Sequence, residues 1–116
     1  YSDFAYEKIE SFKQDKKNIR VTVSVKNTSG RDGEEVVQLY ASYPESKVER
    51  PSKQLRAFRR IPIKAGETRK VTLTVPKEEL GYWNEGKQMF VVEPGTVKLL
   101  IGASSEDIRL EGKIRL

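Results

Sequence analysis

The chain has no cysteine and no histidine among its 116 residues. Without cysteine there is no disulfide framework, no thiolate nucleophile, no iron–sulfur cluster and no structural zinc site of the usual kind. Without histidine, the commonest base near neutral pH and the commonest metal ligand are missing as well. Most catalytic repertoires are therefore excluded, and we expect no cofactor and no metal. A chain without cysteine folds equally well inside or outside a cell, so its localisation stays open.

Long apolar runs are absent too. No segment approaches the ~18 consecutive apolar residues that a membrane-spanning helix needs, and the N-terminus lacks the basic and apolar regions of a secretion signal. We therefore expect no membrane partner. The length predicts a single domain over residues 1–116. Because the chain begins at Tyr1 rather than Met, we expect this domain to be a fragment of a larger protein.

Apolar residues recur at every second position in several segments, a pattern typical of half-buried strands. The alternation is cleanest in residues 19–26 and recurs in residues 35–42, 71–75, 97–101 and 108–116. Further strands are expected at residues 4–12, 54–63 and 89–92. Only residues 76–80 predict a helix, of about one turn, with Pro76 suited to its start.

Turn-forming residues separate these segments. Residues 27–33, 64–67 and 93–95 contain the Gly, Pro, Asn and Ser that turns require. Seven or eight short strands at this spacing predict an all-β fold, an antiparallel two-sheet sandwich of the immunoglobulin or fibronectin type III kind.

The basic residues concentrate in one stretch. The chain carries 22 Lys and Arg against 17 Asp and Glu, a net charge of +5, yet residues 50–66 contain six cations and no acidic residue. These six are Arg50, Lys53, Arg56, Arg59, Arg60 and Lys64. One hypothesis is a polyanion-binding surface, since guanidinium groups pair with anions. The alternative is that the cations protect a strand edge or orient a partner domain. We expect no exposed aromatic residues interleaved among these cations to support a base-stacking platform, so nucleic acid is not expected.

Two apolar features break the simple pattern. Leu55 and Phe58 lie three positions apart, so a β-bulge near Arg56 and Ala57 would be needed to bury both as core anchors. Residues 81–86 form a predicted loop that carries Tyr82 and Trp83. An indole face can stack on a sugar ring, which makes this pair a candidate carbohydrate-binding site. The alternative is that the pair closes one end of the sandwich.

Three adjacent acidic pairs invite comparison with a glycosidase, which needs two carboxyl groups at a defined separation. The pairs are Glu34–Glu35, Glu78–Glu79 and Glu106–Asp107. Each pair lies at a turn or strand edge with no apolar pocket to raise a pKa, so we interpret all three as solvated surface and assign no catalytic residue. Residues 27–29 match a glycosylation acceptor, but an Asn in a Gly-rich turn needs no modification to explain it.

Several segments together resemble one family. Residues 21–40, VTVSVKNTSGRDGEEVVQLY, resemble the strand–turn–strand signature of the fibronectin type III-like domain at the C-terminus of family 3 glycoside hydrolases, which include β-glucosidases and β-xylosidases. Residues 50–58 resemble the family's Arg-Pro, Lys-Glu-Leu, Lys-Gly-Phe segment, and residues 65–67 its Pro-Gly-Glu turn. Residues 90–95 and 101–109 resemble its closing strands. The chain departs from the family pattern at Gln54, Ala57 and Phe90, where Glu, Gly and Trp are usual.

This resemblance implies a non-catalytic accessory domain. In such enzymes the nucleophilic Asp lies in a barrel domain, and the acid/base group lies there or in an adjoining α/β domain. Neither domain is present in this chain, so the chain alone is expected not to be an enzyme. The implied partners are those barrel and α/β domains, with polysaccharide as a further partner. The module would support their packing and border the substrate entrance, and the basic stretch from Arg50 to Lys64 would become a docking or groove-lining surface.

Overall fold

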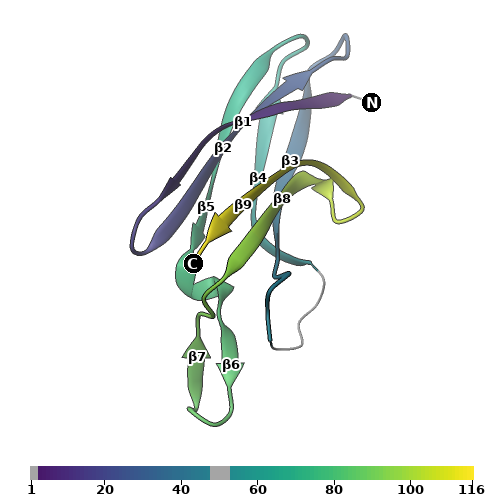
Figure 1. Cartoon of the computed structure of the whole chain (residues 1–116). Coiled ribbons are helices and arrows are strands. Elements are labelled where there is room, and N and C mark those ends of the chain that lie inside the picture. Colours follow the sequence, from purple (N-terminus) through teal and green to yellow (C-terminus); the bar gives the residue numbers. More distant parts are fainter. Residues whose placement is uncertain (1–2, 48–52) are drawn as a thin grey trace.

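The computed structural model describes residues 3–47 and 53–116, which fold as an antiparallel β-sandwich (Figure 1). The elements are β1 (Phe4–Gln14), β2 (Asn18–Asn27), β3 (Gly33–Ser42), β4 (Gln54–Ile63), β5 (Thr68–Pro76), η1 (Lys77–Leu80), β6 (Tyr82–Asn84), β7 (Met89–Val91), β8 (Thr96–Ser104) and β9 (Asp107–Arg115). The predicted all-β class is confirmed. The described residues contain nine strands rather than seven or eight, because the predicted loop at residues 81–86 supplies a strand of its own.

Two sheets form the sandwich. One has the strand order β1-β2-β5 and the other β4-β3-β8-β9, with antiparallel pairing between neighbours. At one side of the sandwich β4 approaches β5, and at the other β1 approaches β9. The β6–β7 hairpin is a separate two-stranded sheet that extends beyond the end of the sandwich (Figure 1). Strands β4 and β5 are therefore edge strands that face each other across one open side.

The core consists of the inward positions of alternating strands. Every second residue of β2 from Ile19 to Val25 is fully buried, as are Val37 and Leu39 of β3. Strands β5 and β8 contribute their own inward positions, namely Val71, Leu73, Val75, Val97, Leu99 and Ile101. Burial of one such side chain stabilises the fold by ~1.5–3 kcal/mol relative to exposure. The alternation in the sequence therefore identifies the inner face of these four strands correctly.

Two local predictions about turns are confirmed. The expected single helical turn is the 3₁₀-helix η1, which begins after Pro76 and buries Leu80 completely. Asn27 is fully buried, and its Nδ2 donates hydrogen bonds to the carbonyl oxygens of Arg31 (2.8 Å) and Ile63 (2.9 Å). Its amide thus anchors the turn after β2, which explains this Asn without any modification.

Candidate docking surface

Strand β4 carries most of the basic stretch, and the structure distributes those cations over different faces. Arg50 lies outside the described residues. Arg60 pairs in register with Val36 on the outer face of the sheet, and its Nε lies 3.8 Å from Glu34 Oε2. Arg59 pairs with the buried Val37, so it lies on the core side of β4 at the open edge. The stretch is therefore not one continuous basic patch.

The two cations that flank β4 lie apart from these arginines. Lys53 Nζ donates a hydrogen bond to the Ser105 carbonyl oxygen, which ties the start of β4 to the turn between β8 and β9. Lys64 is exposed in the turn after β4, where its backbone N–H donates to Glu67 Oε1 (3.2 Å). Both lysines are thus placed at ends of the strand.

A β-bulge interrupts β4 at the predicted place. Ala57 pairs with Leu39 and Leu55 with Tyr40, so Arg56 is the extra residue. Ala57, where the family usually has Gly, is half-buried against the core and is not among the described non-glycine residues with positive φ. The substitution therefore strains nothing at the bulge.

The predicted burial of Leu55 and Phe58 is wrong. The bulge does bring both side chains onto one face, but that is the outer face, which leaves Leu55 46% and Phe58 67% exposed. The physical reason lies in β3. Val37 and Leu39 fill the core, so their neighbours Gln38 and Tyr40 point outward, together with the residues paired to them.

Two hollows lie beside the bulge. The first, about 420 Å³, runs along the open side between β4 and β5 and is lined in part by Arg59, Thr72 and Thr74. The second, about 500 Å³, is bordered by Glu78, Gly81 and Phe90. Leu55, Arg56 and Glu79 line both hollows, which therefore lie side by side. Together these residues form one surface, which we call the β4 groove.

The hairpin next to this groove carries the aromatic pair predicted from sequence, but in a different arrangement. Tyr82 and Trp83 are consecutive in β6, so their side chains leave opposite faces of the strand and do not form a joint platform. Trp83 instead contacts Phe90 of β7, edge to face, with ring centroids 5.3 Å apart. Trp83 is 45% and Phe90 66% exposed, so Trp83 does not close an end of the sandwich.

Sequence reasoning missed Phe90 as a member of the β4 groove, and Met89 beside it on the hairpin, as exposed apolar side chains. Both are more than half exposed. The available signal was the Asn-Glu-Gly turn between two short apolar segments, which predicts a hairpin and places Phe90 opposite Trp83.

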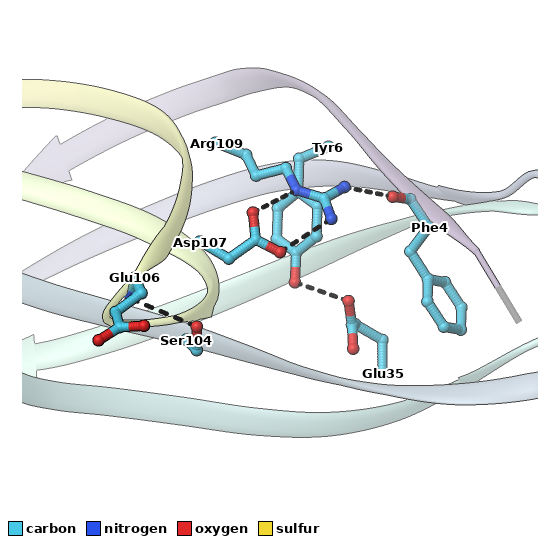
Figure 2. Close-up of polar contacts among 7 residues, drawn as sticks. All are labelled: Phe4, Tyr6, Glu35, Ser104, Glu106, Asp107 and Arg109. Carbon is cyan, nitrogen blue, oxygen red and sulfur yellow. Dashed lines mark hydrogen bonds and ion pairs between the residues drawn. The ribbon is translucent and has the colours of Figure 1, made fainter.

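Two of the acidic pairs contain a residue that forms hydrogen bonds within the chain instead of being only a solvated surface group (Figure 2). Tyr6 donates its hydroxyl hydrogen to Glu35 Oε2 (3.1 Å), and Arg109 forms two hydrogen bonds with Asp107 (2.9 and 3.0 Å). Arg109 Nη1 also donates to the Phe4 carbonyl oxygen (2.6 Å), and its guanidinium lies 5.4 Å from the Tyr6 ring centre. These contacts fasten β1 to β3 and to β9.

The pKa shifts of Tyr6 and Asp107 are those expected of residues in a structural contact. Burial, with the adjacent Glu35 carboxylate, raises the pKa of Tyr6 far above its usual value, so the ring stays neutral. The hydrogen bond from Arg109 lowers the pKa of Asp107. Glu35 and Asp107 therefore bind their own chain and present no pair of carboxyl groups to a ligand.

The described residues lack two further features, a cluster of metal-ligating side chains and a membrane-spanning helix. Residues 3–47 and 53–116 contain no group of three or more metal-ligating side chains. In the same ranges no helix is both long and apolar enough to span a membrane.

The fold and the sequence together define a class of protein, a seven-stranded sandwich module with an added hairpin. The sequence model of the fibronectin type III-like domain matches residues 35–105, which is more than half of the chain. The chain therefore belongs to the fibronectin type III-like domain family.

Several proteins similar to this chain are β-glucosidases. A probable β-glucosidase L of Aspergillus fumigatus is 41% identical over 97 residues, which cover 84% of this chain and 13% of that protein. The crystal structure of a β-glucosidase from Kluyveromyces marxianus matches all of this chain and 14% of its own, with a TM-score of 0.94 and 34% identity. A GH3 β-glucosidase from Bifidobacterium adolescentis matches all of this chain and 17% of its own, with a TM-score of 0.93 and 33% identity.

The predicted resemblance to the fibronectin type III-like domain of family 3 glycoside hydrolases is thus confirmed. The chain spans only about one seventh of the length of these relatives, as the shares of 13%, 14% and 17% show. What it resembles in each of them is a small part of a much larger protein.

Proposed function

We propose that residues 1–116 are a single non-catalytic module of a β-glucosidase, which packs against the catalytic barrel and α/β domains and borders the substrate entrance. The observation that carries the proposal is the match of the whole chain, at a TM-score of 0.94, to 14% of a β-glucosidase. A module that recurs as a small fixed part of a large enzyme has a role in that enzyme's architecture.

The surface chemistry of the chain supports the same role. Exposed apolar side chains are normal when scattered, but a cluster of them marks an interaction surface. Leu55, Phe58 and Phe90 cluster around the β4 groove with two arginines. Aromatic residues and Arg are enriched where proteins contact each other. The groove and the hairpin are accordingly the part of the module that faces the catalytic domains.

The test is heat inactivation of the full-length protein that contains these residues, with and without residues 1–116. We expect removal to speed the loss of β-glucosidase activity at a fixed elevated temperature by about tenfold or more, which corresponds to about 1.4 kcal/mol of lost stabilisation. An unchanged midpoint and rate would contradict the accessory role.

A carbohydrate-binding module that uses Tyr82 and Trp83 is the second candidate, because Trp83 is an exposed aromatic residue on a hairpin that extends beyond the sandwich (Figure 1). Titration of the 116-residue chain with soluble β-glucan or xylan, followed by Trp83 fluorescence, tests it. A saturable change would support this function, and its absence would remove it.

Polyanion binding by the basic stretch is a third candidate, motivated by the six cations between Arg50 and Lys64. Retention of the chain on a heparin column provides its test. Retention that survives charge reversal at Arg59 and Arg60 would eliminate these two residues as the binding surface.

A further inference from the structure

Arg56 carries a buried donor that lacks an acceptor. Its Nη2 donates a hydrogen bond to Gln54 Oε1 (2.5 Å), but its Nε is buried and finds no hydrogen-bond partner in the described part of the chain. An ionised group with a buried N–H left unsatisfied destabilises the fold. Such a donor therefore indicates that the surroundings seen here are incomplete.

The position of Arg56 at the bulge explains why this side chain lines the groove. In a regular strand, successive side chains point either into the core or away from it. Neither kind of side chain lies along the open edge of the sheet. A bulge re-aims a side chain and occurs preferentially at sheet edges. Arg56 is the extra residue of the bulge and lines both hollows of the β4 groove.

The walls of the groove differ in charge. Arg56 and Arg59 belong to the β4 wall, whereas Glu78 and Glu79 belong to the wall formed by η1. Among the ion pairs of residues 3–47 and 53–116, none joins these arginines to these glutamates. Separated charges of opposite sign fix the orientation of whatever binds between them.

The third property of the groove is its apolar area. Leu55, Phe58 and Phe90 are each 46% or more exposed around it. Interfaces between proteins combine such anchors with Arg at their centre, where the anchor is desolvated and the charge is paired. A sugar site would instead present open aromatic faces, whereas Leu55 is aliphatic and the Trp83 ring packs edge to face with Phe90.

We propose that the β4 groove binds one segment of the catalytic part of the same polypeptide, and that this segment places a carboxylate on Arg56 and an apolar side chain among Leu55, Phe58 and Phe90. This inference rests on the proposed function. Because the relatives extend over six to seven times the length of this chain, as the shares of 14% and 17% imply, such a segment is available within one polypeptide. The carboxylate would supply the acceptor that Arg56 Nε lacks.

A photo-crosslinking experiment on the full-length protein identifies the occupant. The crosslinker benzoylphenylalanine is placed at position 58, and at position 13 as a control, because Lys13 is exposed on β1 at the opposite side of the sandwich. We expect position 58 to crosslink to a peptide of the same polypeptide outside residues 1–116, with an Asp or Glu near the crosslink. A crosslink to a second copy of the protein, or none at position 58, would overturn the proposal.

Substitution of Arg56 gives an independent test, with Arg31→Met as the matched control because Arg31 is exposed in the turn before β3. In the full-length protein we expect Arg56→Met to speed heat inactivation by about tenfold, as for a central interface residue. In the 116-residue chain alone, the same variant removes an unsatisfied donor and should leave the unfolding midpoint unchanged or raised. Equal destabilisation in both proteins, or no effect in either, would contradict the proposal.

The accessory role and the binding of a segment in the β4 groove can be disproved independently. If removal of residues 1–116 speeds inactivation but Arg56→Met does not, the accessory role stands and the groove assignment is wrong. If removal has no effect, the accessory role itself is wrong, whatever position 58 contacts.

Discussion

Asp15 holds the turn between β1 and β2 through three hydrogen bonds. Its carboxylate accepts from the backbone N–H groups of Asn18 (2.7 Å) and Lys17 (2.8 Å), and from Arg20 Nη1 (3.0 Å). These bonds, led by the one from Asn18, lower the pKa of Asp15 to about 2, from 3.8. Each favours the ionised form, which is why the pKa falls although the side chain is exposed.

The shift has a definite consequence for stability. Because the pKa of Asp15 is lower in the folded state, its contribution is present above pH 3.8 and is lost as the pH falls towards 2. We expect the free energy of unfolding, measured with urea between pH 7 and pH 2, to decline in that window. The Asp15→Asn variant, which keeps an oxygen acceptor but does not titrate, should show a smaller decline. An identical pH profile for the two proteins would contradict this role.

The sequence predicted the bulge at Arg56, but it did not predict that Leu55 and Phe58 would lie exposed on the outer face. Loss of alternation shows that two residues three apart share a face. Which face they share depends on the partner strand, because Val37 and Leu39 of β3 take the core side. The face is therefore determined by the register between β3 and β4, and it cannot be read from the sequence of β4 alone.

Strands β8 and β9 approach each other closely at Gly102. A Cβ atom at this position would lie 2.0 Å from the Asp107 carbonyl oxygen and 2.9 Å from the Ile108 Cα. Both contacts involve backbone, so neither is relieved by a change of rotamer. The β8–β9 turn therefore requires glycine here.

We expect Gly102→Ala to lower the free energy of unfolding by about 2 kcal/mol or more, the range for overpacking that moves backbone. Gly30→Ala is the matched control, since a Cβ at Gly30 would have nothing within 4 Å. It should change stability by less than about 0.5 kcal/mol. Urea denaturation of both variants measures the difference, and equal losses would show that crowding at Gly102 is not decisive.

Some strands could be predicted from the sequence more reliably than others. Alternation over eight or more residues located β2 and β3 well, because each has one buried and one polar face. A strand was predicted at residues 89–92, where β7 lies, but β6 was predicted as a loop, because a three-residue strand is too short to show a period. Their pairing depends on the turn between them and on the contact of Trp83 with Phe90.

The two open sides of the sandwich differ. On one side, Arg109 bonds to the Phe4 carbonyl oxygen and so bridges β9 and β1. On the other side, β4 and β5 leave the groove, whose rim includes Leu55 and Phe58. The sequence predicted that positive charge is concentrated near β4. It did not predict that these cations are divided between the groove, the outer face and the ends of the strand, because that division follows from the bulge and the strand register.

We propose that the β4 side of this module is covered by the rest of a β-glucosidase. Hydrogen–deuterium exchange of the backbone amides, compared between the 116-residue chain and the full-length protein, tests it most directly. Amides in an edge strand exchange readily when they face water, and slowly when another surface covers them. We predict slower exchange in the full-length protein for β4 and for the β6–β7 hairpin, with β9 and its edge unchanged. Equal exchange of β4 in the two proteins, or protection confined to β9, would contradict the claim.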